Sequence, residues 1–424
     1  MPTLRSAVKR QIHVGKAESR LLLALLSVAL VSGSLAAVLP VSAPAVTPTI
    51  ASDAERSIAE IRMLDATNGW AWSNGVEGQY LLLRTTDGGQ TWNDVTPRAF
   101  PFSEFGGWFL DAQTAWVSTL DRKTYSGGLL RTTDGGKSWT VLVKEGAAPF
   151  KCLTAEGSSC EFLNANHAVA RTADYGAGSA YVRFFETQDG GMTWSPVIIT
   201  TSYAEPNLPP GTIHLSNISG GGIGYYPPVK VIITDGDLAD EQPKGAVRLS
   251  LSLNLGKSWR DLRLPVPDKY RDGLTDPSPV FFDGENGLLP VRILKRNADN
   301  SFAYNVLVFY STHDGGITWT ARPGIVEHAR NYHVVSLKDV FVRGGANLYV
   351  THDGARSWRA IKPSIDFGNE GSKRDVSRMD FVDATHGWVL VYDNVNDSPY
   401  GHHSLYRTSD GGTTWTELPL KIVP

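Results

Sequence analysis

Cysteine is scarce in this sequence, and charged residues are few. The 424 residues include two cysteines, which excludes both a disulfide-stapled scaffold and a metal site built from several thiolates. Asp, Glu, Lys and Arg together make up 20% of the chain, and the net charge is −3. Domains that bind nucleic acid usually carry clustered lysine and arginine, so we expect no nucleic-acid partner.

Familiar catalytic motifs are also missing. The sequence contains no phosphate-cradling glycine loop, no G-x-S-x-G nucleophile elbow and no H-E-x-x-H helix. The acidic stretch from Asp235 to Glu241 offers oxygen ligands to calcium, but it lacks EF-hand spacing and is interpreted as a solvated loop. His402 and His403 are adjacent, so on a strand they point to opposite faces and make a poor chelate. We therefore expect no bound metal and no cofactor.

The amino terminus has the features of a secretory signal peptide, in the usual order. Residues 1–20 carry five basic side chains, an apolar run follows from Leu21 to Leu39, and Ala43-Pro44-Ala45 matches a small-x-small cleavage site. The alternative is an uncleaved membrane anchor, since the run is about as long as the shortest membrane-spanning helices. In both cases residues 1–45 direct export to the cell envelope or the extracellular space, and residues 46–56 form a linker. Any membrane contact is expected through the amino-terminal segment alone.

Export changes what the two cysteines can do. Cys152 and Cys160 lie eight residues apart, and an oxidising compartment favours a local disulfide between them. The alternative is a pair of buried free thiols.

Glycine and tryptophan, in contrast, are abundant, and seven of the twelve tryptophans end copies of one motif. The motif S/T-x-D-x-G-x-x-W is clearest in Thr85-Thr86-Asp87-Gly88-Gly89-Gln90-Thr91-Trp92. Its Asp can accept backbone hydrogen bonds in a tight turn, and its Gly can adopt a positive φ. Its Trp can pack against the neighbouring repeat. The Asp (or Asn) and Trp positions, which we interpret as structural, are Asp87, Trp92, Asp134, Trp139, Asp189, Trp194, Asn254, Trp259, Asp314, Trp319, Asp353, Trp358, Asp410 and Trp415.

Two copies depart from this motif. The fourth has Asn254 in place of the Asp, and the sixth has Ala355 in place of a Gly. We expect both hairpins to be less regular than the others.

A looser turn motif precedes each hairpin, as in Leu64-Asp65-Ala66-Thr67-Asn68-Gly69-Trp70. Each unit therefore contains two strands around a D-x-x-x-G turn and two strands around a D-x-G turn. Four antiparallel strands repeated seven times predict an all-β protein, with a seven-bladed β-propeller over residues 57–424.

The combined motifs resemble the Asp-box, or BNR, repeat, and the chain is similar to the photosystem II stability and assembly factor group of exported propellers. That resemblance implies a non-catalytic binding or scaffold protein, with a membrane protein complex as its partner. Sialidases, sortilin-type receptors and some β-glucanases also carry Asp-boxes. A propeller hosts many unrelated activities, so the resemblance specifies fold more strongly than function.

Loops of variable length are expected on a single face of the propeller, and binding residues are commonly found on such loops. The candidate binding residues are Arg122, Lys123, Tyr125, Arg171, Tyr225, Tyr226, Arg296, Arg343, Tyr400 and His402.

The alternative function is a secreted glycoside hydrolase, sialidase-like or glucanase-like, with a glycan as its ligand. Sialidases need an Arg-Ile-Pro motif in the first blade and further arginines that clamp a carboxylate. The first blade has Ile61-Arg62-Met63, which lacks the proline, and the nearest similar segment, Val291-Arg292-Ile293-Leu294, lies in the fifth. Glucanases need two carboxylates across a cleft, for which the acidic stretch at Asp235–Glu241 is the candidate.

Overall fold

The computed structural model describes twelve segments of the chain. They are residues 56–73, 80–98, 104–120, 127–144, 159–176, 179–200, 213–215, 222–234, 245–299, 301–368, 374–393 and 402–423.

These segments form seven sheets, one for each repeat, in which all strand pairs but two are antiparallel. Blades one and two contain β1 (Ile58–Met63), β2 (Gly69–Ser73), β3 (Leu81–Thr85), β4 (Trp92–Asp94), β5 (Glu104–Phe109), β6 (Ala115–Leu120), β7 (Gly127–Thr132) and β8 (Thr140–Lys144). Blades three and four contain β9 (Ser159–Phe162), β10 (Ala168–Gly176), β11 (Ser179–Thr187), β12 (Ser195–Thr200), β14 (Gly222–Tyr226), β15 (Lys230–Thr234), β16 (Ala246–Ser252) and β17 (Arg260–Pro265). Strand β13 (Ile213–Leu215) joins blade three in parallel with β12.

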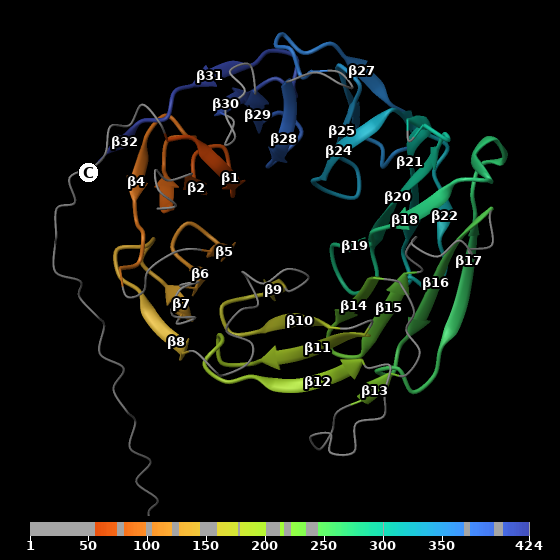
Figure 1. Ribbon diagram of the computed structural model, residues 1–424, viewed down its shortest axis with the longest axis horizontal. Helices are drawn as coiled ribbons and strands as arrows, with labels where there is room; N and C mark the ends of the chain where they lie inside the picture. Colours follow the sequence, from red (N-terminus) through yellow and green to blue (C-terminus); the bar gives the residue numbers. More distant parts are fainter. Residues whose placement is uncertain are drawn as a thin grey trace, which may run out of the picture. The chain divides into compact units, whose positions relative to one another are not determined.

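Blade five contains β18 (Leu274–Pro277), β19 (Val280–Phe281), β20 (Gly287–Arg296), β21 (Phe302–Thr312), β22 (Thr320–Ala321) and β23 (Val326–Glu327). A single 3-10 turn, η3 (Asp268–Tyr270), precedes it. Blades six and seven contain β24 (Ala329–Val334), β25 (Val340–Gly344), β26 (Asn347–Thr351), β27 (Arg359–Ile361), β28 (Arg374–Phe381), β29 (Gly387–Asp393), β30 (His402–Thr408) and β31 (Thr416–Leu418). The blades follow one another around a ring, which confirms the predicted seven-bladed propeller (Figure 1).

Each repeated hairpin is held by its Asp side chain. In blade one the Thr91 N–H donates to Asp87 Oδ1 at 2.9 Å, and the Thr85 hydroxyl donates to the same oxygen at 2.8 Å. The Gly89 N–H in turn donates to Thr85 Oγ1 at 2.9 Å. Gly88 and Gly89 have φ of 76° and 91°, a conformation that a side chain disfavours.

The two departing hairpins keep this geometry, so the expectation that they are less regular is wrong. Asn254 Oδ1 accepts from the Ser258 N–H at 2.9 Å, because an amide oxygen replaces a carboxylate oxygen at this position without a change of shape. The Ala355 N–H donates to Thr351 Oγ1 at 3.1 Å, with Ala355 at φ 63°. The hydrogen bonds of the turn are sufficient to hold an alanine in a conformation that glycine adopts more readily.

The motif tryptophans pack between blades, as predicted, with one exception. Trp92 is completely buried beside Trp388 and Leu390 of blade seven. Trp139, Trp194, Trp319, Trp358 and Trp415 likewise join clusters that combine their own blade with the preceding one. Trp259 differs, because it is 36% exposed.

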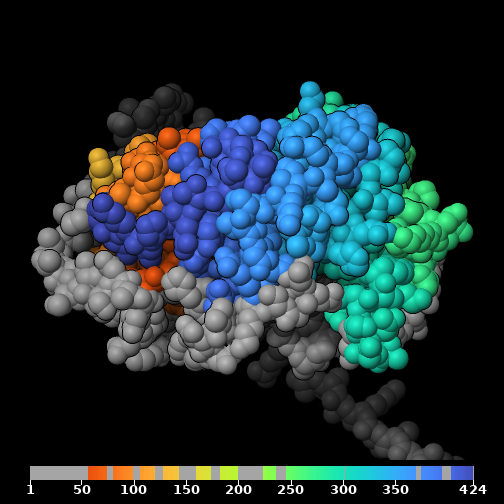
Figure 2. Space-filling model, turned by 90° about the horizontal axis from the view of Figure 1, so that it is seen from above, coloured from red at the N-terminus to blue at the C-terminus, as the bar shows by residue number. Residues whose placement is uncertain are grey.

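The ring closes between blades seven and one. Strand β32 (Ile422–Val423) lies parallel to β4, and the Trp92 N–H donates to Lys421 O at 2.9 Å. The Trp388 indole N–H donates to Gly88 O at 3.0 Å, just as Trp116 of blade two donates to Gly190 O of blade three at 2.9 Å. Figure 2 shows the carboxy-terminal blade, in dark blue, directly beside the orange first blade. Closure therefore repeats the contacts that join the other blades and adds one strand from the carboxy terminus.

Trp92 and Trp259 provide a matched test of packing between blades. We expect Trp92→Ala to lower the free energy of unfolding by about 3–5 kcal/mol, because it opens a cavity between blades one and seven. Trp259→Ala should cost less than about 1 kcal/mol, since this ring already contacts solvent. Urea unfolding followed by far-UV circular dichroism measures both, and equal costs would contradict the packing described here.

The turn carboxylates predict an acid dependence of stability. Burial raises the pKa of Asp314, but hydrogen bonds from Thr318 and Thr312 outweigh burial and lower the pKa to about 2, from the ordinary 3.8. The unfolded chain binds a proton at Asp314 more tightly than the folded chain does. The contribution of the Asp314 carboxylate to the free energy of unfolding is therefore complete above about pH 4 and is lost as pH falls toward about 2. Asp314→Asn should reduce the loss of unfolding free energy over that range by about 1 kcal/mol, allowing for solvent screening. An unchanged acid dependence in urea titrations would show that the hairpin does not hold the carboxylate in its charged form.

Candidate functional site

Several residues predicted from the sequence lie outside the described segments: Arg122, Lys123, Tyr125, Tyr400 and Cys152. Cys160, on β9, is 2% exposed and disulfide-bonded. His402 begins strand β30, where its backbone is opposite Asp393. The apolar segment at residues 21–39 is also outside the description, and no helix in the described part of the chain has the length and apolarity needed to cross a membrane.

The remaining predicted binding residues lie on strands, where the fold uses their polar groups. The Tyr225 hydroxyl is 3.2 Å from Glu186 Oε2, and the Tyr226 hydroxyl donates to Pro279 O at 3.3 Å. Arg343 is completely buried, pairs with Asp375, and donates to Phe367 O at 2.7 Å. Arg171 is half-buried on β10, and the exposed Arg296 on β20 stacks over Phe302 at 4.4 Å. The structure thus places these residues in four different blades, and their binding role stays a prediction.

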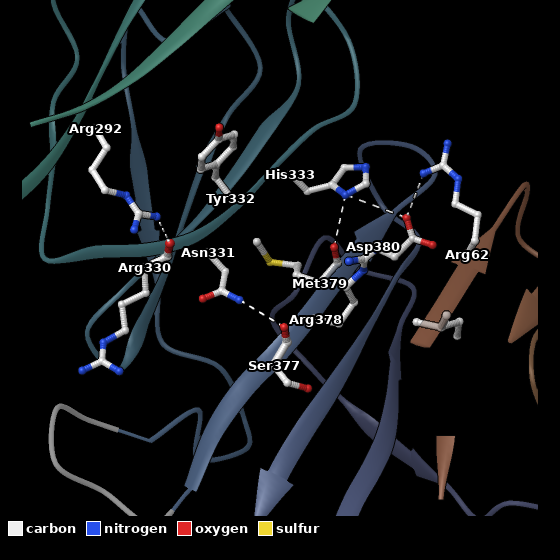
Figure 3. A pocket seen from close by; sticks show the side chains of 11 residues that line it. Arg62, Arg292, Arg330, Asn331, Tyr332, His333, Ser377, Arg378, Met379 and Asp380 are labelled. Carbon is white, nitrogen blue, oxygen red and sulfur yellow. Dashed lines mark hydrogen bonds and ion pairs between the residues drawn. The ribbon is translucent and has the colours of Figure 1, made fainter. Parts of the chain in front are cut away.

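A cavity of about 390 Å³ lies instead among the inner strands of blades six, seven and one, with β20 of blade five on its far side. Figure 3 shows Arg292 and Arg330 on one side of it, and His333, Asp380 and Arg62 on the other. Its lining residues are Ile61, Arg62, Arg292, Arg330, Asn331, Tyr332, His333, Ser377, Arg378, Met379 and Asp380.

Arginine dominates the charge of this cavity, which we call the arginine cavity. Arg62, Arg292, Arg330 and Arg378 line it, whereas Asp380 is the single carboxylate among the described residues of the lining. Arg378 and Arg330 pair with acids next to the cavity, at 2.9 Å from Glu60 and 3.4 Å from Asp375.

Arg292 is held differently from the other three arginines. Its guanidinium donates to the main-chain oxygen of Arg330 and makes no ion pair within the described part of the chain. Its charge therefore remains available to an anionic ligand.

Asp380 organises the side of the cavity where the ring closes. Its carboxylate is 3% exposed and accepts from the Met63 N–H at 2.5 Å, while Arg62 Nη1 lies 3.3 Å away. His333 Nδ1 is 3.8 Å from the same carboxylate and 3.2 Å from Met379 O. One side chain from β28 thus fixes β1 and stands beside a histidine of β24.

His333 is held in its neutral form. Burial lowers its pKa below the ordinary 6.5, Asp380 acts in the opposite direction, and Arg62 adds to the lowering. A carbonyl oxygen can only accept a hydrogen bond, so Nδ1 carries the hydrogen that faces Met379 O. Nε2 of the neutral ring then has a lone pair, and it has no hydrogen-bond partner among the described residues. A neutral imidazole with a free Nε2 can act as a general base.

A second cavity of about 580 Å³ adjoins the first and shares Arg292, Arg330 and Asn331 with it. Phe302, Tyr304, Asn305, His328, Gly345 and Asp375 complete its lining. We call it the aromatic cavity. Within the described segments, no group of three His, Cys, Asp or Glu side chains is arranged to hold a metal ion.

The sequence analysis names Arg62 and Arg292 only in segments that fall short of a sialidase motif, and neither is among its candidate binding residues. The structure brings both into one cavity although they are 230 residues apart. Arg330, Arg378, His333 and Asp380 were missed, because each lies on a strand that carries no motif of its own. The signal available was the polar character of the inner strands, as in Ala329–Val334, where Arg, Asn, Tyr and His follow one another.

Comparison with known proteins gives the fold but no family. No protein-family model matches the chain, and no curated protein matches it. Similar solved structures include α-L-arabinanase of Penicillium chrysogenum, at 12% identity over 74% of this chain and 95% of that one, with a TM-score of 0.40. An ulvan lyase of polysaccharide lyase family PL25 is 10% identical over 85% and 96%, with a TM-score of 0.45. The GH74 enzyme of Niastella koreensis is 12% identical over 86% and 72%, with a TM-score of 0.33.

The prediction of a non-catalytic scaffold, with photosystem II assembly as its most specific form, is wrong as the leading interpretation. The solved structures that resemble the chain include an arabinanase and a polysaccharide lyase, both enzymes that act on glycans. At these identities and TM-scores the likeness carries no activity over to this chain, so the activity has to be argued from the cavity.

The role of Asp380 in ring closure can be tested directly. Asp380→Ala leaves the Met63 N–H without its buried acceptor and should lower the free energy of unfolding by about 2–3 kcal/mol. It should also lower the pKa of His333 further, because the carboxylate raises that pKa. Urea unfolding and an NMR titration of His333 measure the two effects.

The matched control is Asp268→Ala. Asp268 pairs with Arg271 in the open, with its side chain 86% exposed, so the cost should stay below about 0.5 kcal/mol. If both variants lose the same stability, Asp380 does not join blades seven and one.

Proposed function

We propose that this chain is an exported Asp-box propeller that binds and cleaves an acidic glycan in the arginine cavity. The observation that carries the proposal is the convergence of four arginines, one from each of four blades, beside a neutral histidine. The signal peptide and the Asp-box assignment rest on the sequence motifs. The substrate class and the chemistry rest on the cavity.

An anionic ligand explains the arginines best. Asp380, Glu60 and Asp375 pair with Arg62, Arg378 and Arg330, so among the described residues, with His333 neutral, the charge of Arg292 is the one left uncompensated. Guanidinium groups bind carboxylate and sulfate through paired hydrogen bonds, and they do so more strongly where water is partly excluded. The carboxylate of a uronic acid fits this environment, and Arg292 is the arginine best placed to receive it.

Catalysis is assigned to His333. In an elimination, Nε2 takes the proton of the carbon next to the sugar carboxylate, a carbon–carbon double bond forms as the glycosidic C–O bond breaks, and the departing oxygen takes a proton from the imidazolium or from water. In a hydrolysis, Nε2 takes a proton from the water molecule whose oxygen attacks the anomeric carbon, and that proton passes to the departing oxygen. Met379 O holds the ring by accepting from Nδ1. Arginines around the substrate anion stabilise negative charge that develops when the proton leaves. Hydrolysis by a carboxylate pair needs two acids about 5–10 Å apart, whereas the described residues of this lining provide one, which is buried, and the acidic stretch at Asp235–Glu241 lies outside the described segments. The cavity therefore favours cleavage assisted by histidine.

Activity should be specific for acidic polysaccharides. We expect new reducing ends from at least one of polygalacturonate, alginate and hyaluronan, and none from neutral arabinan or xyloglucan. Arg292→Gln should raise KM about tenfold through loss of a charged contact, and His333→Gln should lower kcat at least about 100-fold. Ultraviolet absorbance of an unsaturated product separates elimination from hydrolysis.

Control variants are available at other positions of the fold. Arg98→Gln and His352→Gln change exposed side chains that do not line either cavity, and they should leave KM and kcat unchanged.

The pH dependence of kcat tests His333 as the base. His333 is active when deprotonated and its pKa is lowered, so kcat should persist below pH 6.5 and fall only at lower pH. Unchanged activity in His333→Gln, or no binding of any acidic polysaccharide, would refute the proposal.

A further inference from the structure

The arginine cavity and the aromatic cavity are neighbours. Arg292, Arg330 and Asn331 line both, so the two cavities meet at these three side chains. Their volumes, about 390 and 580 Å³, are each within the range that accommodates small ligands. A ligand larger than one sugar unit can therefore extend from one cavity into the other.

The two cavities differ in chemistry. Among the described residues, the aromatic cavity has no arginine beyond the two it shares, and it adds a carboxylate, Asp375, that Arg330 and Arg343 both contact. A second acidic unit would meet that carboxylate, whereas the hydroxyls of an uncharged unit can donate to it.

An aromatic surface lines the same cavity. Phe302 is half-buried, with the Arg296 guanidinium 4.4 Å from its ring centre. Tyr304 is fixed by a 2.6 Å hydrogen bond from its hydroxyl to Asp272, and its ring packs against Tyr270 at 5.1 Å. Rings held in this way offer a flat apolar face, which suits the C–H face of a sugar.

We infer that the aromatic cavity is a subsite for an uncharged sugar unit that follows the acidic unit bound by the arginines. The ligand is then an internal stretch of a polysaccharide in which acidic and uncharged units alternate. This inference rests on the proposed function, because it takes the arginine cavity as the site of the acidic unit.

Calorimetric titrations test the subsite with defined probes. The His333→Gln protein keeps the probes intact, and the probes are glucuronate, a hyaluronan tetrasaccharide with alternating acidic and uncharged units, and tetragalacturonate with acidic units only. The hyaluronan tetrasaccharide should bind at least about tenfold tighter than either of the others. Phe302→Ala should weaken binding of the hyaluronan tetrasaccharide about tenfold and change the affinity for glucuronate by less than about twofold.

Two further variants separate stacking from folding. Phe302→Tyr keeps the flat ring and should retain tetrasaccharide affinity, while Phe302→Leu keeps apolar volume without a ring and should lose it. Phe282→Ala removes an exposed ring that lines neither cavity and should have no effect. Thermal unfolding of each variant shows whether a loss of binding follows a loss of fold.

The outcomes distinguish this inference from the proposed function. If Phe302→Leu binds the hyaluronan tetrasaccharide as tightly as the parent does, or if tetragalacturonate binds equally well, the subsite is wrong. The arginine site still stands in that case, provided Arg292→Gln weakens glucuronate. If the parent protein binds none of the three probes, the proposed function and the subsite both fail.

Discussion

One hydrogen-bonded turn underlies the whole molecule: a side-chain oxygen that accepts the backbone N–H four residues further along the chain. The distance is 2.9 Å in blade one, in blade four with Asn254, and in blade seven with Asp410. In every blade but the fourth, the turn places the following tryptophan against the preceding blade, so a local contact sets the spacing between those sheets. The turn keeps its hydrogen bonds with Asn254 in place of an Asp and with Ala355 in place of a Gly. The position of the acceptor oxygen is therefore more important for this turn than a negative charge or a glycine.

Regular spacing has a consequence at the centre of the ring. It brings inner strands from blades six, seven and one together with β20, although these strands are far apart in the sequence. Four arginines then share one cavity, which is unfavourable unless acids or a ligand compensate. Asp380, Glu60 and Asp375 compensate three of them, and Arg292 is left for an anion. Ring closure and the candidate site therefore depend on the same residue, Asp380.

The fold could be predicted from the sequence because the repeated turn motifs that define it are short and contiguous. In each repeat, the residues that form the turn and the tryptophan that ends the motif lie within eight residues, as from Thr85 to Trp92. The cavity could not be predicted in this way, since Arg62, Arg292, His333 and Asp380 meet only after the ring has closed. Arg62 and Arg292 enter the sequence analysis only in segments that fall short of a sialidase motif. Tyr225 and Arg343, expected on loops, lie on strands where Glu186 and Asp375 occupy their polar groups.

The most direct test of the account is a crystal structure of the His333→Gln protein with a bound acidic tetrasaccharide. The account predicts a sugar carboxylate at the guanidinium of Arg292, next to Arg330, with the glycosidic bond beside position 333. A tetrasaccharide on the loops outside the two cavities, with the arginine cavity filled by water, would contradict it.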